Sequence, residues 1–183
     1  EDSKAIRAVA NAYDVYYKGS HRAKQLYNMA IASLQAERQL KQPTLLEQAK
    51  EASLIDISLP DIKGKQQKLS DLKGKVVLLD FTAYQTDYSP EYNILLAKIY
   101  KQFRDKGFEI YQVSLDNNEN FWKVSASNLP WICVRDEASI YSTVANLYNV
   151  KNLPSAFLID RTGAIQKRIA SIESISGEIQ KLL

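Results

Sequence analysis

Cysteine and histidine are almost absent from this chain of 183 residues, which has only Cys133 and His21. A single cysteine forms no disulfide within the chain, so cysteine usage gives no sign of the redox compartment. Zinc sites need several cysteine or histidine ligands, and we therefore expect neither a metal site nor a cofactor. The G-x-S-x-G motif of serine hydrolases is also missing, so we interpret His21 as an exposed or capping residue.

Long hydrophobic runs are missing as well. No apolar run approaches the about 20 residues that span a bilayer, so we expect no transmembrane segment in this chain. The chain starts at Glu1 without a signal peptide, but such peptides are removed on maturation. The sequence is therefore compatible with a membrane tether upstream of Glu1. Basic and acidic residues interleave to a net charge of +3, without the basic stripe of nucleic-acid-binding proteins.

What remains is the composition of a soluble globular domain, with 45% apolar and 25% charged residues. The first 50 residues have helical periodicity, for example at Ile6, Val9, Tyr13 and Tyr16. Residues 1–50 are therefore predicted to form a helical hairpin plus a short helix. The sequence does not indicate an oligomeric state.

Residues 53–183 instead alternate between short strands and helices. Strands are predicted over residues 54–59, 76–81, 108–115, 131–134, 156–159 and 164–169. Helices are predicted over residues 90–106, 119–127, 140–148 and 174–183, with Phe121, Trp122 and Val124 on or near the buried side of the second. The early β-α-β units require parallel pairing and the late hairpin antiparallel pairing, so we expect an α/β domain with a mixed central sheet.

Three blocks of this region carry a family resemblance. Residues 69–81 look like the pattern L-x-D-L-K-G-K-x-V-L-x-x-F. Residues 113–116 are followed by Trp122 and by residues 129–131, and residues 152–163 look like x-P-T-x-F-L-I-D-x-x-G. Together they resemble the thioredoxin-like superfamily, in the extracytoplasmic branch related to the TlpA/ResA and AhpC/TSA proteins of Bacteroides-type bacteria.

The resemblance implies a thioredoxin-like three-layer fold for residues 53–183 and a location in the periplasm or cell envelope. It places Asp80 where thioredoxins keep a buried carboxylate that handles protons for two thiols. It also places Pro154 at a cis-proline that faces those thiols. Burial at the end of a central strand is expected to raise the pKa of Asp80.

The two thiol positions of the family's C-x-x-C motif fall on Thr86 and Ser89. A hydroxyl cannot replace the attacking thiolate of disulfide exchange, so we expect no catalytic residue here. Ser89 has a simpler interpretation as a cap at the start of a helix. Cys133 lies in a short apolar strand, where a free cysteine most often packs as a small hydrophobe.

The sequence thus favours a redox-inactive domain that binds a protein or an extended peptide, with Tyr84, Tyr88, Leu153 and Pro154 lining a groove and Tyr92 nearby. One alternative is a thiol-disulfide oxidoreductase or antioxidant protein that acts through Cys133 or a partner's thiols. Another is a structural module whose interaction surface is the helical segment 1–50.

A polar run over residues 116–119 follows a predicted strand. It is compatible with a cation site, and equally with a loop that ends in a helix cap. The sequence does not decide between the two.

Overall fold

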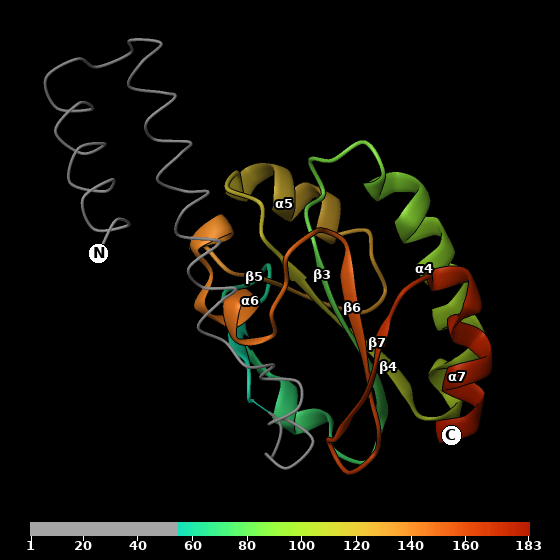
Figure 1. Ribbon diagram of the computed structural model, residues 1–183. Helices are drawn as coiled ribbons and strands as arrows, with labels where there is room; N and C mark the ends of the chain where they lie inside the picture. Colours follow the sequence, from blue (N-terminus) through green and yellow to red (C-terminus); the bar gives the residue numbers. More distant parts are fainter. Residues whose placement is uncertain (1–54) are drawn as a thin grey trace, which may run out of the picture. The chain divides into compact units, whose positions relative to one another are not determined.

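The computed structural model describes residues 55–183, drawn in colour in Figure 1. The predictions of helices in residues 1–50 and of a capping role for His21 lie outside the described residues. The strands are β1 (Ser58–Pro60), β2 (Gln66–Lys68), β3 (Val76–Thr82), β4 (Phe108–Ser114), β5 (Ile132–Arg135), β6 (Ser155–Ile159) and β7 (Ile165–Ile169). The α-helices are α4 (Ser89–Phe103), α5 (Glu119–Ala126), α6 (Thr143–Leu147) and α7 (Ile175–Leu182).

Five strands form the central sheet in the order β5-β4-β3-β6-β7. Strand β3 pairs in parallel with β4, which pairs in parallel with β5. On its other side β3 pairs antiparallel with β6, and β6 forms the antiparallel hairpin with β7. The predicted mixed sheet is confirmed.

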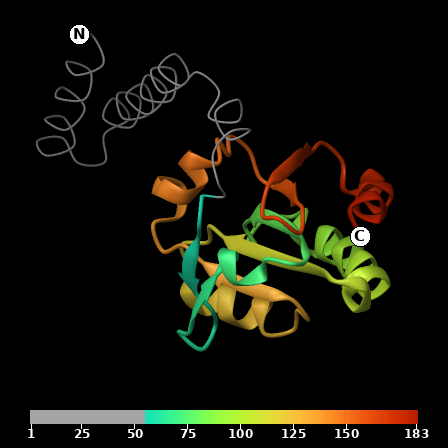
Figure 2. The same ribbon diagram turned by 90° about the horizontal axis from the view of Figure 1, so that it is seen from below.

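Helices cover both faces of this sheet and make three layers. Helices α4, α5 and α7 contribute to one buried apolar cluster, whereas α6 and the segment around β1 contribute to the other. Figures 1 and 2 show α4 and α7 together on one side of the sheet and α6 on the opposite side. We call these sides the α4 face and the α6 face. None of the helices within residues 55–183 is long and apolar enough to cross a membrane.

The start of the described region differs from the prediction. The expected strand over residues 54–59 appears only as β1, which lies outside the central sheet and pairs with β2. Strand β2 was not predicted, because Gln66-Gln67-Lys68 is polar and too short to have a period. The predicted helix over residues 140–148 is also split: a 3₁₀ turn, Ser139–Tyr141, precedes α6, and the side chain of Ser142 caps α6.

Two further features concern the helices α4 and α5. After α4, a 3₁₀ turn ends at Gly107, whose φ of 92° is left-handed, so the predicted end of this helical segment at residue 106 is confirmed. Trp122 of α5 is buried as expected, but Phe121 is 43% exposed and Val124 is 69% exposed. The expectation for these two residues was wrong because α5 has only eight residues and buries a narrow stripe through Trp122 and Ala126.

Candidate functional site

Asp80 is the most unusual residue of the central sheet, because it is a fully buried carboxylate in the otherwise apolar first part of β3. The hydroxyl of Tyr92 donates to one carboxylate oxygen at 2.7 Å, and the amide of Gln112 donates to the other at 2.9 Å. Burial raises the pKa of Asp80 to about 6, while the two hydrogen bonds oppose that rise. The expected rise in the pKa of Asp80 is confirmed, and its hydrogen-bond partners are a tyrosine and an amide.

Gln112 connects Asp80 to the rest of the site. Its side-chain Nε2 also donates to Asn93 at 3.1 Å, and its Oε1 accepts from the hydroxyl of Tyr84 at 2.7 Å and from Nε1 of Trp131 at 2.9 Å. Sequence reasoning missed Gln112. The available signal was an amide side chain between Tyr111 and Val113 inside the predicted strand 108–115, because a polar residue in a buried strand needs hydrogen-bond partners.

Thr86 and Ser89 lie where β3 leads into α4, Thr86 in the connecting loop and Ser89 as the first residue of the helix. The hydroxyl of Thr86 donates to the carbonyl of Ala83 at 2.6 Å. Ser89 is buried, and its Oγ accepts from Nδ2 of Asn93 at 3.2 Å. The prediction that Ser89 caps the helix was wrong: Tyr88 holds the N-cap position, Ser89 is the first residue inside α4, and α4 has no side-chain cap.

The two tyrosines of the predicted groove differ. The ring of Tyr84 is buried and its hydroxyl is bonded to Gln112, so Tyr84 does not line an exposed surface. That part of the prediction was wrong because the polar network draws the ring inward. Tyr88 is half-buried and its ring contacts Tyr92 edge to face, with ring centroids 6.2 Å apart. The Tyr88 hydroxyl is buried without a hydrogen-bond partner.

Pro154 lies beside the end of β3. Ser155 is the register partner of Phe81, which brings Pro154 level with Thr82, the last residue of β3. The peptide bond between Leu153 and Pro154 is cis, the isomer that the resemblance implies. Pro154 is exposed and Leu153 is half-buried. The loop after β3 and the loop before β6 therefore meet at the same edge of the sheet.

The polar run over residues 116–119 begins with a buried aspartate. The carboxylate of Asp116 accepts from the backbone amides of Tyr84 and Gln85, at 2.8 and 3.0 Å. Asn118 caps α5 by accepting from the backbone amide of Phe121 at 3.0 Å, so the capping interpretation is confirmed. Within residues 55–183 no group of three or more histidine, cysteine or acidic residues could hold a metal ion.

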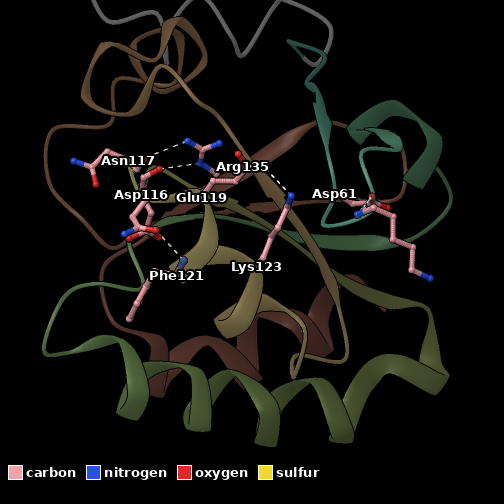
Figure 3. Close-up of polar contacts among 9 residues, drawn as sticks. Asp61, Asp116, Asn117, Glu119, Phe121, Lys123 and Arg135 are labelled. Atoms are coloured by element: carbon pink, nitrogen blue, oxygen red, sulfur yellow. Dashed lines mark hydrogen bonds and ion pairs between the residues drawn. The ribbon is translucent and has the colours of Figure 1, made fainter.

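Figure 3 shows how this loop is joined to β5. Arg135 donates through Nε to the carbonyl of Asp116 at 3.0 Å and through a terminal nitrogen to the carbonyl of Asn117 at 3.4 Å. On the outer side of α5, Lys123 and Glu119 form an exposed ion pair at 2.6 Å. The Arg135 contacts hold the loop after β4 against β5, and the ion pair stays within α5.

Cys133 lies on β5, where it is the register partner of Gln112. Its side chain is 6% exposed, and its sulfur lies 3.9 Å from Oε1 of Gln112. Burial raises the pKa of the Cys133 thiol to about 12, so the thiolate is rare at neutral pH. This environment is that of an unreactive thiol.

Comparison with known proteins agrees with the fold. The AhpC/TSA family pattern matches residues 51–168. The chain is 30% identical to the thiol-disulfide oxidoreductase ResA of Bacillus cereus over 129 residues, which cover 67% of this chain and 72% of ResA. It is 29% identical to human nucleoredoxin over 119 residues, 63% of this chain but only 27% of nucleoredoxin.

Solved structures give the same picture. A thioredoxin-like protein from Bacteroides vulgatus is 51% identical, with a TM-score of 0.66 and coverage of 71% of this chain and 86% of that chain. A thiol-disulfide oxidoreductase from Bacteroides fragilis is 30% identical, with a TM-score of 0.66 and coverage of 72% of this chain and 100% of that chain. Sequence, sheet order and relatives agree: the chain belongs to the AhpC/TSA family, in its thioredoxin-like branch with TlpA and ResA.

Proposed function

We propose that this chain is a thioredoxin-fold domain that has lost redox catalysis and binds an extended peptide or protein segment in the cell envelope. The observation that carries the proposal is the presence of hydroxyls, those of Thr86 and Ser89, at the junction of β3 and α4. Disulfide exchange needs a thiolate that attacks a disulfide and a second thiol that resolves the mixed disulfide. Neither hydroxyl supplies this chemistry.

The buried thiol supports the same proposal. Cys133 has no second cysteine in this chain to resolve a mixed disulfide. Its burial and its raised pKa also remove it from solution chemistry. A peroxidase reaction meets the same obstacle, since it needs an accessible thiolate that is oxidised to a sulfenic acid.

Peptide binding is supported by the surface beside the junction. Pro154 is exposed level with the end of β3, and Leu153 and Tyr88 are each half-buried, so all three offer atoms to a ligand. An extended peptide is recognised through backbone hydrogen bonds together with contacts to alternate side chains. We assign Tyr88, Leu153 and Pro154 to this binding surface. The envelope location rests on the family resemblance and on relatives such as ResA.

Reduction of insulin disulfides tests the loss of redox catalysis. Wild-type protein is compared with Thr86→Cys/Ser89→Cys and with Thr86→Ala/Ser89→Ala as the matched control. We expect turnover only from the cysteine pair, because the surrounding architecture persists and only the thiols are missing. Turnover by the wild type would contradict the proposal.

The binding role is tested with a probe that has no reactive thiol, the S-alkylated insulin B chain. Amide chemical shifts of the wild type are followed during titration, and changes are expected at Tyr88, Leu153 and Ser155. Tyr88→Ala is expected to weaken the affinity about tenfold, since buried aromatic contacts dominate such interfaces. Tyr141→Ala, at the exposed 3₁₀ turn before α6, is the control. Shift changes confined to other surfaces would contradict this site.

The names of the relatives favour a second candidate, a thiol-disulfide oxidoreductase that acts through Cys133 or a partner's thiols. Under this candidate the native thiol reacts with iodoacetamide and Cys133→Ala abolishes turnover. Under the proposed function the thiol labels only after denaturation. A structural module that interacts through residues 1–50 makes a third, distinct prediction: deletion of residues 1–50 abolishes partner capture and Tyr88→Ala does not.

A further inference from the structure

In the part of the chain that the structure describes, Asp116 accepts the hydrogen bonds that join the backbone of the loop after β3 to the end of β4. It is the second residue after β4, and it is 2% exposed. Oδ2 accepts from the backbone amide of Tyr84 at 2.8 Å and from the hydroxyl of Ser114 at 2.7 Å, while Oδ1 accepts from the backbone amide of Gln85 at 3.0 Å. Both carboxylate oxygens are therefore used, and two of the three donors belong to the loop.

The remaining contacts of the loop are mostly internal. Thr86 donates to Ala83 through its hydroxyl, and the backbone amide of Ser89 donates to the carbonyl of Thr86 at 3.1 Å. These bonds curl the loop but do not attach it to the sheet. The hydrogen bond from the Tyr84 hydroxyl to Gln112 holds only the side chain of Tyr84. The loop backbone itself is held by Asp116.

The geometry points to Asp116 as the positioning residue of the binding surface, which sets the path of residues 83–88 and through it the place of Tyr88. The effect on peptide affinity rests on the proposed function, whereas the effect on the loop does not. The role requires a carboxylate, because three donors converge on its two oxygens and an ionised carboxylate accepts without donating. An asparagine would turn an NH₂ group toward at least one of these donors.

Asp136 supplies a matched control. It is also a buried aspartate just after a strand, β5, but its carboxylate accepts from the backbone amide of Ala138 at 2.9 Å within its own loop. Asp116→Asn and Asp136→Asn therefore make the same chemical change at similar depth. Only the first removes contacts to residues 83–88.

The experiment measures hydrogen exchange of the Tyr84 and Gln85 amides and affinity for the S-alkylated insulin B chain. In Asp116→Asn we expect exchange to be at least about tenfold faster at one or both of these amides and the affinity to be about tenfold weaker, since hydrogen bonds to a charged group are lost. In Asp136→Asn both quantities stay near wild type even if the melting temperature falls equally. A loss of general stability alone would move the two variants together.

Each outcome is decisive. Unchanged exchange at Tyr84 and Gln85 in Asp116→Asn would overturn the inference. If the wild type binds no probe, the proposed function fails while the exchange data still decide the role of Asp116. If Asp116→Asn does not fold, Ser114→Ala takes its place. It removes the hydroxyl that donates to Oδ2 and that accepts from the Asp116 backbone amide at 3.1 Å, and faster exchange at Tyr84, which also binds Oδ2, is then expected. An exchange rate at Tyr84 that Ser114→Ala leaves unchanged would again overturn the inference.

Discussion

The two faces of the central sheet differ at the end where β3 and β4 stop. On the α4 face, Asp80 and Gln112 form the centre of a buried hydrogen-bond network. On the α6 face at the same level, Phe81, Tyr148 and Phe157 pack ring against ring, with centroids 5.6 to 6.2 Å apart. At this end of the sheet, one face is held by hydrogen bonds between polar side chains, and the other by packing of aromatic rings.

The difference arises from the alternation of side chains along a strand. Asp80 and Phe81 are neighbours in the chain but point to opposite faces, and the same holds for Gln112 and Tyr111. The candidate site can therefore change its polar groups without disturbing the aromatic cluster behind it. We expect stability to depend most on the α6 face and loop conformation on the α4 face.

The largest effect is expected from Phe157→Ala. Phe157 is fully buried in the aromatic cluster, and its truncation leaves a cavity that costs about 4 kcal/mol of unfolding free energy. Urea denaturation measures this loss, and the folded variant should keep its affinity for the S-alkylated insulin B chain. A loss of affinity larger than the loss shown by Tyr88→Ala would break the separation of the two faces.

The next effect is expected from Gln112→Leu, which keeps the volume but removes the amide. The Tyr84 hydroxyl, the Trp131 nitrogen and one Asp80 oxygen lose their partner, so we expect a loss of about 3 kcal/mol in urea denaturation. Gln67→Leu on β2 is the control, since its half-buried amide donates one bond, to Asp61. Equal losses in the two variants would show that the network adds nothing beyond single hydrogen bonds.

A smaller effect concerns pH. Because burial raises the pKa of Asp80 from 3.8 to about 6, the folded protein binds this proton more tightly than the unfolded chain does. The contribution of Asp80 to stability is therefore fully present at low pH and is lost as the pH rises through this window. The unfolding free energy of wild type minus that of Asp80→Asn should fall by about 2 kcal/mol between about pH 4 and pH 7. If this difference in unfolding free energy stayed constant or rose with pH, the pKa of Asp80 would not be raised in the folded protein.

The smallest effect is expected on the outer side of α5, away from both faces. Val124 is 69% exposed, so Val124→Ala should change the unfolding free energy by less than about 0.5 kcal/mol. Trp122→Ala on the buried side of the same helix is the comparison and should cost several times more. Similar losses of unfolding free energy in the two variants would show that Val124 is buried, as the sequence predicted.

The sequence predicted the sheet better than its surroundings. The apolar runs of β3 and β4 identify strands that are covered on both faces, and the left-handed Gly107 marks the end of the segment between them. Strand β2 was not predicted because its three residues are all polar and show no alternation of apolar and polar side chains. Phe121 and Val124 were misplaced because helical spacing identifies an apolar side but not how wide a stripe the neighbours cover.

For the candidate site, single residues were predictable and their partners were not. The burial of Asp80 followed from its place in β3, whereas Gln112 lies far along the chain and meets Asp80 only through the register of β3 and β4. The hydroxyl of Ser89 could have capped α4 if the helix began at Pro90, but α4 begins at Ser89, with Tyr88 at the N-cap position. Such choices depend on tertiary contacts that local sequence does not contain.

The pairing of β3 with β6 also matters while the protein is being made. One edge of β3 stays open until Ser155 and its neighbours have left the ribosome, because its partner strand lies so late in the chain. Until then a mostly apolar central strand offers unpaired backbone groups to other nascent chains. Chains cut short before β6 should therefore aggregate during translation, and the edge where Thr82 meets Pro154 is assembled among the last parts of the domain.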